Sequence, residues 1–337
     1  MEHGEINQRY ERITVQASSG KSTATPGRVM ITILVVLSVF RVGLFVRMPY
    51  YLLGDAFYDD FNQVQLATYL LSGQWLGPYG FTTLIKGISY PLFLAFCNVL
   101  SMPYPFMLGV FYLASAGLFC RALNKIFQSP SFSMIVYLIL IYSPAGFDTS
   151  VTGRLYRNAL AFPCVLLCLA LILMTYLKRD EPIGKQLPCL IASGLAFLFF
   201  YYLREDSIWF LPFFIASLLI IGIWVIWFSD YGKGQKALRC LVLLIPVVIC
   251  LLGRLAYMEQ NEAAYGVFTT NDRVSGPFAE MVGNMIRIKS DKEEDLNYWI
   301  STDKLEKIID ACPSLAEHKG VILDEMDELE RTADGTR

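Results

Sequence analysis

Long apolar runs separated by short polar stretches dominate the chain, and they predict its architecture. A helix needs about 20 apolar residues to cross roughly 30 Å of hydrocarbon. Runs that approach this length predict seven membrane-spanning helices, at residues 29–50, 105–124, 132–147, 158–177, 187–203, 207–228 and 237–257. The third run is the shortest and carries Pro144. The pattern therefore predicts an all-α polytopic membrane protein.

Two shorter patterns predict helices that do not cross the membrane, both within a long first outer loop, residues 51–104. The apolar run from Tyr90 to Leu100 would extend only about 16 Å as a helix, so we expect an interfacial or re-entrant helix there. From Phe61 onward, apolar residues recur every three or four positions, which predicts an amphipathic helix. Its expected apolar face consists of Val64, Leu66, Ala67, Leu70 and Leu71, and its polar face of Asn62, Gln63, Gln65 and Thr68.

Polar segments flank the predicted transmembrane domain, residues 29–257. Residues 1–28 are Ser/Thr-rich and predict a disordered cytoplasmic tail, and the run after them is too long and too late for a cleaved signal peptide. Residues 258–337 form a small polar extracytoplasmic segment, in which Asp303 to Asp310 has helical character and Ser301 or Thr302 suits the cap.

Composition supports a membrane class and excludes several others. With 55% hydrophobic and 17% charged residues, the chain is too apolar for a soluble globule, and its net charge of -2 gives no sign of nucleic-acid binding. All of the eight cysteines except Cys312 lie in apolar runs, where cysteine behaves as a small hydrophobe. His3 and His318 are far apart in the polar ends, so we expect neither a disulfide framework nor a histidine metal site.

Basic residues predict the orientation. If the amino-terminal tail is cytoplasmic, the inner ends of the later spans are all basic. These ends carry Arg121 and Lys125, then Lys178, Arg179 and Lys185, then Lys233, Lys236 and Arg239. We therefore expect a multi-pass protein of the cell membrane with its N-terminus cytoplasmic and its C-terminus extracytoplasmic. Four polar features then share the outer face: the Asp59-Asp60 pair, residues 152–158, residues 203–207 and the segment after Glu259.

The acidic pair at Asp59 and Asp60 allows two interpretations. At the start of the amphipathic helix, the two carboxylates would stabilise exposed N–H groups and the helix dipole. Alternatively, one of them is a general base toward an acceptor hydroxyl, or holds a divalent cation. A carboxylate-only cation site would combine the pair with Asp206, although no spacing demands one.

"LREDS" places Arg204 beside Glu205 and Asp206 between two apolar runs. In one interpretation this is a solvated loop between spans. In the other, Arg204 holds a phosphate or pairs with Asp59 or Asp60, while the two acids cap the next helix or line the site.

Four further cations are candidates for anion binding. In "TGRLYRN", Arg154 and Arg157 lie one turn apart at the outer start of a span, so both can point at one anion, and both equally suit lipid headgroups. Arg41, in the outer half of the first span, either snorkels outward or faces a polar cavity under the aspartates. Lys86 precedes the interfacial helix, where lysine is common at a headgroup boundary.

The order of these features resembles the GT-C class of integral-membrane glycosyltransferases, especially the branch with protein O-mannosyltransferases and aminoarabinose transferases. That branch carries an acidic pair just outside the first span, followed by a small residue, Leu, Gly and Trp. The matching positions are Asp59, Asp60, Ala67, Leu70 or Leu71, Gly73 and Trp75. "KGISYPLFLAF" is similar to the lysine and Pro-Leu helix that close the family's first outer loop, but lacks the frequent Lys-Pro-Pro. The resemblance covers roughly residues 30–230.

The resemblance implies inverting transfer of a sugar from a polyprenyl-phosphate donor to a hydroxyl of a protein, glycan or lipid acceptor. Asp59 would be the general base, and Asp60 would orient acceptor or donor. Arg157 and Arg204 would stabilise the leaving phosphate, with Arg154, Lys86 and Arg41 behind them and Glu205 and Asp206 in support. No cofactor is required by the pattern, and a divalent cation remains open.

Two other classes remain open. One is a carrier for a lipid-linked or small anionic substrate, which should place paired polar residues near the middle of several spans. The other is a noncatalytic membrane scaffold whose polar segment recruits a partner. The clustering of charges at one face favours an enzyme.

Overall fold

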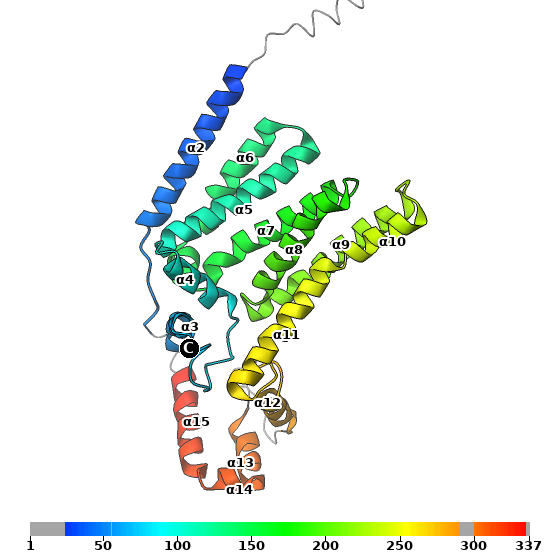
Figure 1. The fold of residues 1–337 in the computed structure, drawn as a ribbon. Helices are drawn as coiled ribbons and strands as arrows, with labels where there is room; N and C mark the ends of the chain where they lie inside the picture. The colour runs from blue at the N-terminus through cyan, green and yellow to red at the C-terminus, as the bar shows by residue number, and fades with distance from the viewer. Residues whose placement is uncertain (1–23, 55, 290–299, 335–337) are drawn as a thin grey trace, which may run out of the picture. The chain divides into compact units, whose positions relative to one another are not determined.

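The computed structural model describes residues 24–54, 56–289 and 300–334 (Figure 1). Across these residues the regular elements are all helical, and extended backbone pairs only in an isolated parallel bridge between Tyr51 and Arg154. The chain forms two compact units: Met1–Leu71 with Ile88–Cys250, and Ser72–Gly87 with Leu251–Arg337. Most of the tail predicted at 1–28 lies outside the described residues, and helix α2 begins at Ala24.

Six helical segments are long and apolar enough to cross a membrane, so the chain is a multi-pass membrane protein. They coincide with six of the seven runs predicted from sequence. These segments are α2 (Ala24–Arg47), α5 (Tyr104–Phe127), α7 (Asn158–Leu177), α8 (Ile183–Tyr201), η4 (Glu205–Phe210) with α9 (Leu211–Trp227), and α10 (Lys233–Val242) with α11 (Ile245–Tyr265).

The remaining predicted run, 132–147, contains a shorter helix. Helix α6 (Pro130–Ile141) has 12 residues and is followed by the short turns η2 (Pro144–Gly146) and η3 (Thr149–Gly153). At 1.5 Å per residue, α6 extends about 18 Å, less than the hydrocarbon thickness. The seventh crossing therefore stays a prediction.

Between the end of α5 and the start of α7, the chain nevertheless returns to the end of the helix bundle at which α5 begins. The ring of Tyr104, at the start of α5, meets Tyr50 at a centroid distance of 5.6 Å. The neighbouring Tyr51 donates its N–H to the carbonyl of Gly153, just before α7, at 3.1 Å. The starts of α5 and α7 thus lie together, and α6 with its turns makes the return.

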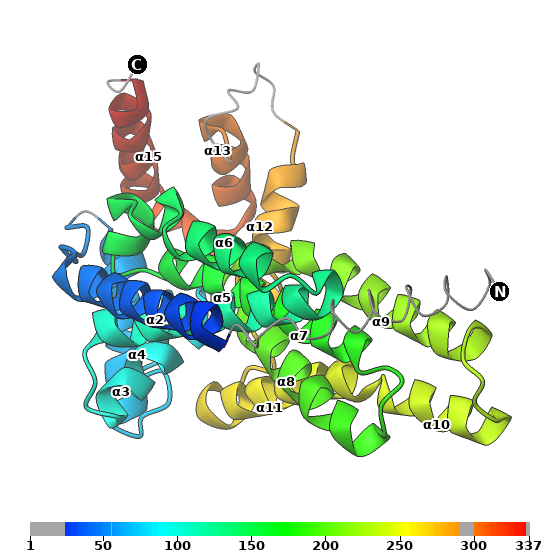
Figure 2. The same cartoon turned by 90° about the horizontal axis from the view of Figure 1, so that it is seen from above.

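Helix α7 occupies the centre of the first unit. It packs against α5 and α8, while α2 and α6 pack on α5 (Figure 2). Cys164 and Cys168 are buried within α7, as expected of cysteines that act as small hydrophobes. Small residues permit close helix contacts where lipid gives no hydrophobic drive to association. A Cβ added to Gly194 of α8 would lie only 2.8 Å from Cα of Pro246 in α11.

The segment between α2 and α5 contains two helices of the first unit. Helix α4 (Ser89–Val99) has 11 residues and coincides with the expected short helix. Helix α3 (Asn62–Leu71) follows a π-helical turn, η1 (Phe57–Phe61), and packs against α4. The predicted polar face of α3 is wrong at two positions, because Asn62 and Gln63 are buried with the residues four positions later, Leu66 and Ala67. A spacing of four puts each pair on the same helical stripe.

The second unit carries the polar segment. Its helices beyond α11 are α12 (Pro277–Arg287), α13 (Thr302–Ala311), α14 (Pro313–Ala316) and α15 (Lys319–Asp334). The predicted helix at Asp303 to Asp310 is confirmed as α13, with Ser301 at its N-cap position. The hydroxyl of Ser301 donates to Asp303 at 2.7 Å rather than capping a backbone amide.

Candidate functional site

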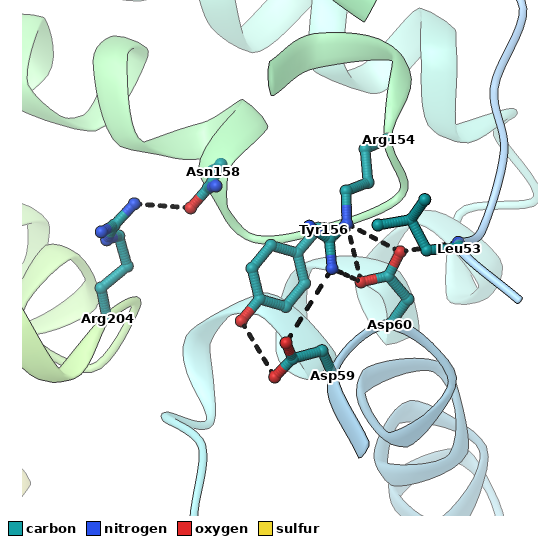
Figure 3. A network of polar contacts seen from close by, with 7 residues as sticks. All are labelled: Leu53, Asp59, Asp60, Arg154, Tyr156, Asn158 and Arg204. Carbon is teal, nitrogen blue, oxygen red and sulfur yellow. Dashed lines mark hydrogen bonds and ion pairs between the residues drawn. The ribbon is translucent and has the colours of Figure 1, made fainter. Parts of the chain in front are cut away.

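Three segments far apart in sequence meet at one end of the first unit (Figure 3). They are the acidic turn η1, the residues that lead into α7, and the turn between α8 and η4. Arg154 binds Asp60 across 94 positions of sequence, and Arg157 binds Glu205. Arg204 donates to Asn158 at 2.5 Å, which joins the second and third segments.

Asp60 is the anchor of this cluster. Its side chain is fully buried, and Arg154 donates to it through Nε, 2.9 Å from both oxygens, and through Nη2 at 2.5 Å. The backbone N–H of Leu53 also donates to Oδ2 at 3.0 Å. A buried carboxylate needs this degree of pairing to offset its lost hydration. The same hydrogen bonds raise the pKa of Arg154, so its guanidinium stays charged at all ordinary pH.

Asp59 differs sharply from its neighbour in exposure. Its side chain is 41% exposed, against 0% for Asp60. Arg154 Nη2 lies 3.9 Å from Oδ2, and the hydroxyl of Tyr156 lies 3.4 Å from Oδ1. Both contacts are longer than those that hold Asp60, so Asp59 is the accessible carboxylate of the pair.

The ring of Tyr156 contacts two of the three arginines, Arg154 and Arg157. Its ring is buried, with the guanidinium of Arg154 at 4.5 Å and that of Arg157 at 5.1 Å from the centroid. Each contact falls within the range of a cation–π interaction. Sequence reasoning missed Tyr156 and Asn158, although the aromatic residue between two arginines in "GRLYRN" was the available signal.

The contacts of the arginines bear on two interpretations of the sequence. Arg204, for which a solvated loop, a phosphate contact and a pairing with Asp59 or Asp60 were all open, holds Asp206 through Nε at 2.8 Å and Nη2 at 2.7 Å. Arg204 and Asp206 are two positions apart, so they can pair without bringing distant segments together. The hydrogen bond to Asp206 raises the pKa of Arg204. Arg154 and Arg157 do not share a helical turn, because α7 begins only at Asn158.

Arg157 combines an ion pair with a spare donor. Its Nη1 contacts Glu205 at 2.6 Å, so Glu205 binds Arg157 rather than the adjacent Arg204. The residue is buried, and its Nε has no hydrogen-bond partner among the described residues. An unused buried donor beside a carboxylate is a position where an incoming oxygen would gain a bond.

The cluster as a whole carries three arginines and four carboxylates, so its formal charge is +3 − 4 = −1. Each arginine holds at least one carboxylate: Arg154 with Asp60, Arg157 with Glu205, and Arg204 with Asp206. Within the described part of the chain, no group of three His, Cys, Asp or Glu side chains is arranged to hold a metal ion. Asp60 and Asp206, two members of the suggested cation site, are held by different arginines.

Arg41 lies outside this cluster. It is fully buried, so it does not snorkel, and it donates to the carbonyls of Ile141 and Gly146, at 2.6 Å each. The rings of Phe45 and Phe147 lie 4.1 and 3.8 Å from its guanidinium carbon. A cation at the last carbonyls of a helix is favoured by the helix dipole. Arg41 thus closes the carboxyl end of the short helix α6.

Lys86 belongs to the second unit. It follows Ile85, whose carbonyl accepts from the side chain of Asn271 at 3.2 Å. Its role in phosphate binding stays a prediction.

Comparison with known proteins adds no identity to this geometry: no family model, curated protein or solved structure matches the chain. The chemistry of the cluster has to be argued from its own residues.

Proposed function

We propose that this protein is a membrane glycosyltransferase of the GT-C type, which moves a sugar from a polyprenyl-phosphate donor to an acceptor hydroxyl. The observation that carries the proposal is the contrast between the two aspartates. Asp60 is buried and bound by Arg154, whereas Asp59 is 41% exposed, with Arg154 at 3.9 Å. A rigid anchor next to an accessible base is an arrangement suited to proton transfer.

In the proposed reaction, Asp59 accepts the proton of the acceptor hydroxyl as the oxygen attacks the anomeric carbon. The bond between that carbon and the phosphate oxygen breaks, and its electron pair leaves with the polyprenyl phosphate. Attack opposite the leaving group inverts the anomeric configuration. Glycosylated acceptor and polyprenyl phosphate are the products, and Asp59 then returns its proton to solvent.

The developing charge on the phosphate requires fixed cations, and Arg157 and Arg204 are the proposed contacts. The spare Nε of Arg157 supports this role. Tyr156 and Asp60 would keep Arg154 in position while the phosphate engages the other two. The acceptor would be a protein, a glycan or a lipid.

The distribution of charge supports an outward-facing site. At the opposite end of the helices, Arg239 donates to the carbonyls of Arg179 and Glu181, and Gln186 donates to that of Lys178. That end gathers the lysines and arginines of the short loops, which the positive-inside rule assigns to the cytoplasm. With α6 as a seventh, shortened crossing, the N-terminus would be cytoplasmic and the polar segment extracytoplasmic, in a cell membrane.

A carrier is less well supported. A carrier needs polar or charged groups along a route through several spans. Arg41 is a cation buried within a span, but it binds two backbone carbonyls and two rings rather than an acid. A noncatalytic scaffold would not need the paired cluster around Asp59.

The test is sugar transfer in liposomes that contain the purified protein and polyprenyl-phosphate sugars extracted from cells. Asp59→Asn should lower turnover by about a hundredfold or more, the usual size of a general-base effect. Asp180→Asn is the matched control, because Asp180 is 53% exposed beside an arginine at the opposite end. Equal turnover in the wild type and Asp59→Asn would remove Asp59 from the chemistry. Absence of turnover in all three proteins would favour the carrier or the scaffold.

A further inference from the structure

A second concave site lies in the unit formed by Ser72–Gly87 and Leu251–Arg337. Its volume is about 890 Å³, within the range of small-molecule sites. Two stretches of chain line it, one around Tyr79 and one that follows α11. Four aromatic rings and two opposite charges stand out in the lining: Tyr79, Phe81, Phe268 and Phe278, with Asp272 and Arg273.

The walls of this cavity are fixed by a buried polar scaffold. Asn261, on α11, is fully buried, and its amide donates to the carbonyl of Thr269 at 2.6 Å. The indole N–H of Trp75 donates to the other end of the same amide at 2.9 Å. The side chain of Asn271 donates to the carbonyl of Ile85 at 3.2 Å. These bonds cross-link the two lining stretches, so the cavity is formed before any ligand arrives.

Tyr79 is held in one orientation. One face of its ring stacks on Tyr265, with centroids 5.2 Å apart and planes at 30°, and its hydroxyl donates to Asp272 at 3.1 Å. Desolvation and the charge of Asp272 raise the pKa of Tyr79, so the hydroxyl remains a donor at neutral pH. Tyr79 as a whole residue is still 51% exposed, and Phe81 is 75% exposed. The cavity therefore presents aromatic surface to solvent.

The charges restrict the class of ligand. Asp272 and Arg273 are adjacent and sum to zero, so the rim gives no net attraction to an anion. Arg273 has no ion pair among the described residues. A hydrocarbon chain laid over these groups would desolvate them without replacing their hydrogen bonds, which is costly.

A sugar ring satisfies both requirements. A pyranose has a face of C–H groups that suits the electron-rich face of an aromatic ring, and an edge of hydroxyls that both donate and accept hydrogen bonds. We propose that this cavity binds a neutral saccharide, with its ring against Tyr79 and Phe81 and its hydroxyls on Asp272 and Arg273. Its role as a site for an acceptor glycan rests on the proposed function, whereas binding itself does not.

The experiment measures binding of neutral trisaccharides of glucose, mannose and N-acetylglucosamine to the full chain in phosphatidylcholine nanodiscs. At least one trisaccharide should bind at millimolar concentration or below. Phe81→Ala should weaken it by about three- to tenfold, the usual worth of an aromatic contact. Asp272→Asn should weaken it as well. Phe228→Ala is the matched control, because Phe228 of the first unit is 70% exposed, and it should leave binding unchanged.

Three results would overturn the inference: no trisaccharide binding to the wild type, equal binding by Phe81→Ala, or a phospholipid that copurifies with the wild type and is lost from Phe81→Ala. Asp59→Asn separates the two proposals, because it should abolish sugar transfer and leave trisaccharide binding intact. Transfer without trisaccharide binding would retain the proposed function and reject this site. Binding without transfer would do the reverse.

Discussion

Asp60→Asn gives the sharpest test of how the acidic turn is built. The substitution keeps the shape of the side chain and the acceptor for Leu53, but it removes the charge that Arg154 holds. An amide would also turn N–H groups toward a guanidinium that only donates. Asp59→Asn is the natural comparison, since it makes the same chemical change one residue earlier on an exposed side chain.

The expected magnitudes differ because the two carboxylates differ in burial. Removing one partner of a buried ion pair costs about 3–5 kcal/mol. Arg154 retains 18% exposure and has Asp59 at 3.9 Å as a second acceptor, so part of this loss is recovered. We expect Asp60→Asn to lower the free energy of unfolding by about 2–3 kcal/mol. For Asp59→Asn, whose contact is long and exposed, we expect about 0–1 kcal/mol.

The assay is thermal unfolding of the purified protein in detergent, followed by intrinsic fluorescence. At about 2 °C per kcal/mol for a chain of this length, Asp60→Asn should lower the Tm by about 4–6 °C, and Asp59→Asn by about 2 °C at most. Arg154→Ala combined with Asp60→Asn should be less destabilising than the sum of the two single changes. Equal small shifts for both aspartates, or full additivity with Arg154→Ala, would refute the assignment of Asp60 as the structural anchor.

Two further substitutions test the packing of the apolar helices by the same assay. Arg41→Met should lower the free energy of unfolding by about 1–3 kcal/mol, because the carbonyls of Gly146 and of the last residue of α6 lose their donors. An unchanged or higher Tm would mean that the cost of burying the guanidinium exceeds the gain from those hydrogen bonds. Gly194→Ala should cost about 1–3 kcal/mol because the new methyl group meets the backbone of Pro246. Gly184→Ala, in the same helix with open space around it, should cause no loss, and equal effects at both glycines would contradict the close contact.

The membrane helices were predictable because length and apolar composition alone decide whether a segment can cross hydrocarbon. The short run at Tyr90 to Leu100 was predictable for the same reason, since its length excluded a full crossing. Burial of Asn62 and Gln63 was not, because it depends on α4, which packs against that side of α3. An amphipathic pattern identifies a helix more securely than it identifies which polar residues the partner will cover.

The candidate site divides in a similar way. The predicted membrane topology placed the acidic pair and the arginine segments on the same side of the membrane. In the structure these segments are in contact. The pairing within the cluster could not be predicted from local sequence, because Asp60 and Arg154 lie 94 positions apart and meet only in the folded chain. The interpretations of Arg204 included only distant partners, a phosphate or solvent, and omitted Asp206, two positions away.

The short helix α6 has a consequence for how the chain is made. Gln128 adopts a left-handed conformation with φ of 50°, and Ser129 caps α6, so α5 and α6 are joined by a tight turn. A helix of 12 residues is too short for stable insertion into the membrane on its own. If α6 crosses the bilayer, as the sequence predicts, we expect its insertion to depend on the preceding helix α5, with which it forms a hairpin. The turn at Gln128 and Ser129 would then act during synthesis, before the rest of the molecule exists to hold α6 in place.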